Sequence, residues 1–399
     1  MNARSTLLVF FLSPLAGQWI VGAASIPMGI TNSKVILSSL TEVVKADIPT
    51  LARIANPEGR DGMRSLSGCC HILLVYGRGP TDLSYFTSGE LALKALMDEQ
   101  TAVAAFGKSP FVRTRNGLRY FLSEDPVFNS DVGEAHQDQC LATFAALGIP
   151  VEAPIRTGSH SYSIHDLVSE SVASFSLDQK ELAWTAIAFA KYIPPKTDWT
   201  NRFRQRISFS DLAEYLLRRD LNRESCAGTH ILQALIQIAQ AHSNSPILNR
   251  RARQQVDAYL QIKLQELVQL QQSDGSWTKQ WCASVHEDLG SVTPFFTKFL
   301  VTSHVLEAIQ MLGSARELPE AVHLRAREWL RHSLTSPEIR PDGSWLCPFA
   351  HATKSLSEVQ RVTENNAIIN SNTTFHLPSS EVEHGRTGPT VETQSNKKL

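Results

Sequence analysis

Apolar residues recur at helical spacing through most of the chain beyond residue 132. Apolar side chains three or four positions apart form one face of an amphipathic helix. The predicted helices span residues 135–147, 164–175, 179–191, 209–218, 225–241, 249–271, 294–312 and 319–333. The pattern therefore predicts an all-α fold, or nearly so, made of helical hairpins.

The chain before residue 132 has a more mixed pattern. Segments 43–55 and 91–105 have helical spacing, and residues 70–76 form an apolar run that suits a helix or a strand. Residues 113–122 contain the Asn116-Gly117 pair, which is typical of a tight turn between two short strands.

The two ends of the chain differ in composition from its middle. A positive residue, an apolar run and small residues follow one another over residues 1–24, which is the order of a secretory signal peptide. Residues 353–399 are rich in Ser, Thr, Asn, Glu and Lys, which indicates a disordered tail. Between them we expect a less regular region over residues 25–131 and a helical-repeat domain over residues 132–352. An exported chain of this kind lies in the periplasm, in the cell envelope or outside the cell, and it contacts the membrane only through an uncleaved N-terminal segment.

Composition and charge exclude other classes of protein. Apolar residues make up 42% of the 399 residues and charged residues 19%, as in a globular protein. The net charge of −1 gives no field that would attract nucleic acid. The densest basic run, residues 202–206, is followed closely by Asp211 and Glu214, so we expect a solvated helix face there and no nucleic-acid partner.

Two short motifs repeat along the helical region. The pattern His-x-x-Gln/Glu-Ala/Cys-Leu/Ile begins at His136, His230 and His304, each time in an apolar helical segment. The sequence Asp-Gly-Ser-Trp occurs at residues 274–277 and 342–345, each time after a long amphipathic segment. This alternation predicts stacked helical hairpins that share a core, arranged as an α/α toroid or a short solenoid.

The run Leu-Gln-Gln-Ser-Asp-Gly-Ser-Trp at residues 270–277 resembles the Q-W repeat of squalene cyclases and prenyltransferase-type α/α toroids. In that family the Gln caps a helix and the Trp stacks beside it, roles that the resemblance gives to Gln272 and Trp277. The resemblance covers residues 225–351 and implies a toroid fold. The acidic motifs Asp-x-Asp-Asp and Asp-Asp-x-x-Asp of the terpene cyclases do not occur, so we do not expect terpene cyclisation.

A fainter resemblance links the chain to exported helical proteins of planctomycete genomes, some of them labelled as GTPase activators for ADP-ribosylation factors. Such activators need a four-Cys zinc finger with paired Cys-x-x-Cys, which this sequence lacks. It also lacks the usual motifs of serine hydrolases, P-loop NTPases, dinucleotide-binding proteins and zincins. None of these activities is therefore expected.

The cysteines suggest a metal site. Four of the six have a histidine four positions away, more than 13 histidines in 399 residues would give by chance. The pairs are His136/Cys140, Cys226/His230, Cys282/His286 and Cys347/His351. On a helix the members of such a pair lie one turn apart on one face, where both can bind one metal ion. Thiolate and imidazole ligands together suit zinc.

The chain also loosely resembles protein prenyltransferases, which hold zinc with an Asp, a Cys and a His from separate helices. This resemblance narrows the choice of ligands. The metal-ligand candidates near the Asp-Gly-Ser-Trp turn and the histidine-headed helices are Cys226, His230, Asp274, Cys282 and His304. The alternative is that these residues are structural, because buried cysteines are common in protein cores and histidines often bond locally at helix starts. Residues 69–71, Cys-Cys-His, suit a buried apolar segment better, because adjacent side chains diverge.

Carboxylates offer a different chemistry, because α/α toroids also include glycosidases and polysaccharide lyases. An acid and a base would come from Asp274, Asp342, Glu124-Asp125 or Glu287-Asp288, and sugar-stacking platforms from Trp277, Trp281 and Trp345. Against this, the Asp of an Asp-Gly turn usually bonds to its own backbone, and the following Trp usually packs in the core.

Two hypotheses of function follow. The first is an exported helical-repeat module without identified catalytic residues, which binds a protein or envelope ligand on a concave face. The alternative is an α/α toroid enzyme with a Cys/His zinc site of prenyltransferase-like geometry, or a carboxylate-based enzyme that acts on glycans. Convergence of the candidate ligands on one coordination sphere distinguishes the zinc enzyme from the binding module.

Overall fold

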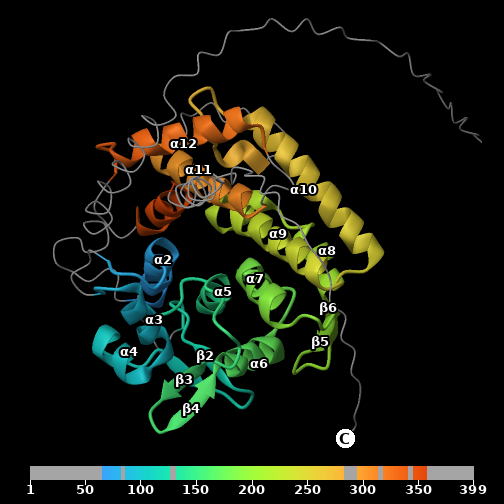
Figure 1. Ribbon diagram of the computed structural model, residues 1–399. Helices are drawn as coiled ribbons and strands as arrows, with labels where there is room; N and C mark the ends of the chain where they lie inside the picture. Colours follow the sequence, from blue (N-terminus) through green and yellow to red (C-terminus); the bar gives the residue numbers. More distant parts are fainter. Residues whose placement is uncertain are drawn as a thin grey trace, which may run out of the picture. The chain divides into compact units, whose positions relative to one another are not determined.

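Figure 1 shows a computed structural model of the chain, in which residues 65–81, 86–125, 132–282, 294–312, 318–339 and 345–356 are described. The chain divides into a unit of residues 1–39 and a unit of residues 40–399, and every described residue belongs to the second. The predicted signal peptide and the predicted helix at residues 43–55 lie outside the described residues. Among the described helices, none has both the length and the apolar character that crossing a membrane requires.

The described part of the chain is mostly helical, as the sequence predicts. Its helices are α2 (Leu66–Tyr76), α3 (Gly89–Met97), α4 (Glu99–Phe106), α5 (Gln139–Ala146), α6 (Ile164–Ser174), α7 (Leu182–Tyr192), α8 (Phe209–Leu216), α9 (Thr229–Asn244), α10 (Arg250–Leu270), α11 (Phe295–Met311) and α12 (Glu320–Leu334). Residues 346–356 form a further helix, which runs past the expected boundary at residue 352. Each helix predicted beyond residue 132 is present, with ends that differ by at most four residues.

Three antiparallel hairpins connect the helices. They are β1 (Phe111–Arg113) with β2 (Leu118–Tyr120), β3 (Pro154–Thr157) with β4 (His160–Ser163), and β5 (Asp198–Thr200) with β6 (Arg206–Ser208). Their registers pair Phe111 with Tyr120, Ile155 with Tyr162, and Trp199 with Ile207. The first is the hairpin expected at Asn116-Gly117.

The single helix expected over residues 91–105 is two helices, α3 and α4. The backbone of Asp98 between them is extended, with φ −138° and ψ 119°. Its carboxylate accepts a hydrogen bond of 2.8 Å from the Thr101 N–H, the usual arrangement at a helix N-cap. The apolar spacing alone would continue α3 through residue 98. Asp98 ends α3 there because its side chain caps the start of α4.

Helices that are not consecutive along the chain pack side by side around one core. α2 contacts α5, α5 contacts α7, α7 contacts α9, and α9 contacts α11 (Figure 1). α12 packs on α11, and α8 and α10 pack on α9. One hydrophobic cluster joins α2 to the helix at residues 346–356, so the core runs across the boundary expected at residue 131. The toroid or solenoid arrangement stays a prediction.

The Asp-Gly-Ser-Trp turn at residues 274–277 is structural. The Asp274 carboxylate accepts a 2.9 Å hydrogen bond from the Ser276 N–H, and the Trp277 indole N–H donates to the Leu267 carbonyl at 2.8 Å. Gly275 has φ +94°, and a Cβ there would lie 2.3 Å from the Arg325 carbonyl oxygen, so only glycine fits.

The glutamine next to this turn differs from the one that the Q-W resemblance implies. Gln271 donates to the Gly275 carbonyl at 3.0 Å and to the Val322 carbonyl at 2.8 Å. Gln272 reaches only the Leu270 carbonyl, at 3.3 Å. Of the second copy of the motif, only Trp345 is among the described residues, and it is buried.

Candidate metal centre

Five histidines and two cysteines gather between α2, α9, α11 and the helix at residues 346–356. We call these side chains the His/Cys cluster; its members are His71, His136, Cys226, His230, His304, Cys347 and His351. The ring centroids of His304 and His351 are 3.8 Å apart, those of His230 and His304 5.4 Å, and those of His71 and His351 5.8 Å. The cluster therefore collects residues from both ends of the described chain.

Three overlapping groups in this cluster have the spacing of metal ligands. They are Cys226/His304/Cys347, His230/His304/His351 and His71/Cys347/His351, and within each group the ligand atoms all lie within 4.8 Å of one another. The Sγ atom of Cys347 is 3.5 Å from Nε2 of His304. Cysteine sulfur and imidazole nitrogen at such separations form a donor set that suits zinc.

Hydrogen bonds orient three of the histidines so that Nε2 is the ligand atom. Nδ1 of His71 lies 2.7 Å from the Ser67 carbonyl oxygen. Nδ1 of His304 lies 2.8 Å from the Leu300 carbonyl oxygen. Nδ1 of His351 bonds to the Glu307 carboxylate. Because each acceptor takes the Nδ1 proton, Nε2 is the nitrogen of each ring that is left to bind a metal.

His230 supplies an independent sign of a ligand. Its side chain is 2% exposed, and neither ring nitrogen has a hydrogen-bond partner among the described residues. The Trp184 ring packs against it at 4.6 Å. A buried polar group without a partner costs about 1–3 kcal/mol, so such groups are rare unless they serve a function. A metal ion bound within the cluster would satisfy one of the two ring nitrogens of His230.

The electrostatics of the cluster differ between its ligands. Burial and the neighbouring His351 lower the pKa of His71 to about 3, and burial and His304 lower the pKa of His351 to about 4, so both rings are neutral at pH 7. A hydrogen bond from Cys347 and the charge of His304 hold the pKa of the Cys226 thiol well below its ordinary value, whereas contact with Cys226 raises the pKa values of Cys347 and His304. Neutral imidazole and thiolate are the forms that bind metal, so a bound ion would displace the protons of Cys347 and His304.

Glu307 is the anionic support of this cluster. Burial alone would raise its pKa, but the charge of Lys354 and the hydrogen bonds from His351 and Lys354 hold it well below the usual value for a glutamate. Lys354 lies 2.7 Å from one carboxylate oxygen, and Gln233 donates to the other at 3.2 Å. A carboxylate that accepts the Nδ1 proton of a metal-binding histidine fixes the orientation of the ring and raises its basicity.

The backbone at Cys226 is strained where it enters the cluster. Cys226, Ala227 and Gly228 have φ values of 51°, 55° and 73°, three left-handed residues in succession directly before α9. Left-handed non-glycine residues cost of order 1–3 kcal/mol each and occur mainly at functional sites. This turn corrects the expected helix start at residue 225, because the residues before Thr229 are not α-helical.

Two of the five sequence candidates lie outside the three groups. Asp274 holds its own turn and forms an ion pair with Lys298 at 3.0 Å. The Cys282 thiol bonds to the Lys279 carbonyl at 3.2 Å, and burial raises its pKa to about 11. His286, the pair mate of Cys282, lies outside the described residues. The structure therefore brings together Cys226, His230 and His304, and not Asp274 or Cys282.

A pocket of about 370 Å³ adjoins the cluster and is lined by His71 and His351. Most of its wall is apolar, from α2, α5 and α7, including Leu73, Ala146 and Ile187. The repeated His-x-x-Gln/Glu motif explains its polar part. The histidines of the three copies enter the cluster, and the fourth residues, Gln139, Gln233 and Glu307, line the pocket. The repeated motif thus supplies residues both to the His/Cys cluster and to the adjoining pocket.

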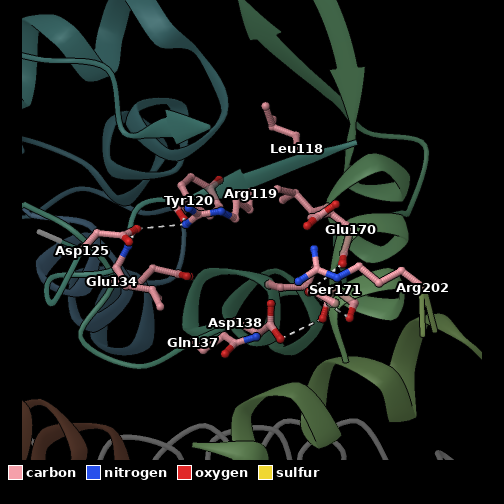
Figure 2. A pocket seen from close by; sticks show the side chains of 14 residues that line it. Leu118, Arg119, Tyr120, Asp125, Glu134, Gln137, Asp138, Glu170, Ser171 and Arg202 are labelled. Atoms are coloured by element: carbon pink, nitrogen blue, oxygen red, sulfur yellow. Dashed lines mark hydrogen bonds and ion pairs between the residues drawn. The ribbon is translucent and has the colours of Figure 1, made fainter. Parts of the chain in front are cut away.

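A second pocket, of about 390 Å³, bears on the carboxylate hypothesis (Figure 2). Asp125, Glu134, Asp138 and Glu170 line it, and each has partners within the protein. Arg119 binds Asp125 at 3.0 Å, the Cys140 N–H donates to Glu134 at 2.7 Å, Ser171 donates to Asp138 at 2.8 Å, and Thr114 donates to Glu170 at 2.7 Å.

The carboxylates predicted from the sequence also have structural partners where they are described. Glu124 pairs with Lys180 at 2.9 Å, and Asp125 pairs with Arg119. Trp277 and Trp281 are fully buried in the core, so their rings offer no surface for a sugar to stack on. The acids Glu287, Asp288 and Asp342 lie outside the described residues.

Sequence reasoning missed three residues of the groups: His71, Cys347 and His351. Cys347 and His351 carried a signal, since they form one of the Cys/His pairs four positions apart. His71 carried only the weak signal of one polar residue inside an apolar run.

Comparison with known proteins finds no matching family model, no matching curated protein and no matching solved structure.

Proposed function

We propose that this protein is a zinc-dependent enzyme in which Cys226, His304 and Cys347 hold the ion and the adjoining pocket holds a small, largely apolar substrate. The observation that carries the proposal is the convergence of these ligand atoms within 4.8 Å from three separate segments of the chain. With three protein ligands, a zinc ion keeps a fourth position open and supplies Lewis-acid chemistry there.

The residues around the ion have distinct roles in this proposal. Glu307 orients His351, whose Nε2 is left as a proton acceptor or ligand beside the pocket. Gln139 is 2% exposed, its side-chain oxygen has no partner among the described residues, and it lines the pocket. That oxygen would accept a hydrogen bond from a substrate N–H or O–H group. The apolar wall would exclude water and bind the rest of the substrate.

An enzyme fits these observations better than a binding module does. A binding module leaves its cysteines and histidines scattered through the core, as Cys282 lies apart from the cluster here. Cys226, His230 and His304 gather instead with Cys347 and His351, and Cys226 lies on the strained turn. Export through an N-terminal signal and an α/α toroid arrangement belong to the proposal, because they rest on the sequence patterns and on the resemblance to the squalene cyclase and prenyltransferase repeats.

The test is elemental analysis of the chain purified without chelator or metal-binding tag. We expect about one zinc per chain or more, and a loss of about one zinc in Cys226→Ser. Cys282→Ser is the matched control, because it removes a buried thiol that belongs to none of the three ligand groups and bonds to the Lys279 carbonyl and the Asn222 side chain. Its zinc content should equal that of the wild type. Absence of zinc from the wild type, or equal losses in the two variants, would overturn the proposal.

A further inference from the structure

The His/Cys cluster contains more ligand atoms than one ion can use. The three ligand groups together comprise four histidines and two cysteines. A four-coordinate zinc ion takes at most four of these six side chains, and an enzyme site takes three. At least two buried side chains therefore remain without a role in the proposed function.

Two of the side chains that the first ion does not use form a further ligand group with Cys347. His71, His351 and Cys347 have ligand atoms within 4.8 Å of one another. His71 is 6% exposed and His351 is 3% exposed. In both rings Nδ1 is engaged, by the Ser67 carbonyl and the Glu307 carboxylate, so Nε2 is free to bind. The link to the first group is Cys347, which belongs to both.

We propose that the cluster binds two metal ions, with Cys347 as a thiolate bridge between an ion held by Cys226 and His304 and an ion held by His71 and His351. This proposal rests on the proposed function for the first ion. A thiolate has enough lone pairs to bind two metals, and paired ions are a recurrent arrangement in hydrolytic and transferase sites. His230, whose ligand group includes His304 and His351, lies where it can complete either coordination sphere.

The second ion would face the pocket. His71 and His351 line it, whereas Cys226 and His304 do not appear in its wall. Two zinc ions carry four positive charges, and two thiolates carry two negative charges. The Glu307 carboxylate does not reduce the difference, because it is already paired with Lys354. The excess positive charge would favour a substrate with an anionic group at the inner end of the pocket and an apolar body along its wall.

The test counts zinc ions by native mass spectrometry after equilibration with zinc and removal of loosely bound ions by a weak chelator. We expect two zinc ions in the wild type and one in His71→Asn. Asparagine keeps a donor near the position of Nδ1 for the Ser67 carbonyl but removes the Nε2 ligand. His332→Asn is the matched control, because Nδ1 of His332 makes the same bond, at 2.8 Å, to the Glu328 carbonyl on an exposed helix face.

The outcomes separate the two proposals. One zinc ion in the wild type would overturn the second site and leave the proposed function standing, whereas no zinc would overturn both. Two ions in both the wild type and His71→Asn would overturn the assignment of His71. If His71→Asn does not fold, the wild-type count still decides, supported by titration with cobalt. Two equivalents of cobalt should then each increase the thiolate-to-metal absorption, because Cys347 binds both ions.

Discussion

The Sγ atom of Cys347 lies 3.5 Å from Nε2 of His304, although 43 residues separate the two along the chain. Nδ1 of His304 is engaged by the Leu300 carbonyl, so Nε2, which meets the thiol, is the nitrogen left to bind a metal. This contact joins α11 to the helix at residues 346–356 through two potential metal ligands.

Zinc should stabilise the fold through this contact. A ligand that binds only the folded state, present at about 1,000 times its Kd, adds about 4 kcal/mol to the free energy of unfolding. Thermal unfolding with zinc and with chelator measures the effect, which Cys347→Ser should abolish. Cys69→Ser is the control, because Cys69 is fully buried on α2 but belongs to none of the ligand groups. An equal zinc response in both variants would contradict the assignment of Cys347.

The hydrogen bond between Glu307 and His351 should increase the affinity for zinc. Glu307→Gln removes the negative charge that receives the Nδ1 proton of His351, and loss of such a partner weakens metal binding by about 10- to 100-fold. Competition with a chromophoric chelator measures the change. Glu328→Gln alters an exposed Glu/His pair, with Glu328 and His332 3.8 Å apart, and should leave the affinity unchanged. A loss confined to Glu328→Gln, or no loss in Glu307→Gln, would contradict this role.

The left-handed turn before α9 should require its glycine. A Cβ at Gly228 would lie 2.5 Å from the Leu221 Cβ, whereas at Gly148, with a similar φ of +68°, nothing lies within 4 Å. Gly148→Ala should therefore lose only the backbone preference, about 1–2 kcal/mol, and Gly228→Ala considerably more. Urea unfolding compares them. Equal losses would show that the turn can move away from Leu221.

The second pocket should give the protein a distinct pH dependence. Burial and the neighbouring Asp138 raise the pKa of Glu134 from 4.5 to about 8. A raised carboxyl pKa means that the folded state binds the proton more tightly. Its contribution to stability is therefore present at low pH and is lost as the pH rises from about 4.5 to about 8, by about 1.4 kcal/mol per pH unit within that window.

Glu134→Gln tests this contribution, because glutamine still accepts the Cys140 N–H and does not titrate. Urea unfolding at a series of pH values, in metal-free protein, should show a smaller decline with rising pH in the variant than in the wild type. Glu124→Gln, at a largely exposed carboxylate paired with Lys180, is the control and should follow the wild type. The same decline in Glu134→Gln as in the wild type would refute the role of Glu134.

The helices were predictable from the sequence because their apolar spacing coincides with their burial. In α10, for example, Val256, Leu260 and Leu267 are buried at helical spacing, and polar residues between them, such as Gln261 and Gln265, are exposed. The exceptions occur where a single residue changes the backbone locally. Asp98 ends α3 and caps α4, and the left-handed residues before Thr229 delay α9.

The site was only partly predictable, because its ligands meet across helices and not along one. Pairs four positions apart drew attention to Cys226 and His230, but Nε2 of His304 meets Cys347 from another helix. His71 was assigned to a buried apolar segment. It is buried as expected, yet its ring meets His351, which only the packing of α2 beside the helix at residues 346–356 could reveal.

X-ray absorption spectroscopy at the zinc edge of the zinc-loaded protein identifies the atoms that bind the ion. We expect sulfur scatterers at about 2.3 Å together with nitrogen scatterers at about 2.0–2.1 Å, and fewer sulfur scatterers in Cys226→Ser. Zinc surrounded only by nitrogen and oxygen, or a spectrum unchanged in Cys226→Ser, would contradict the claim that Cys226, His304 and Cys347 hold the ion.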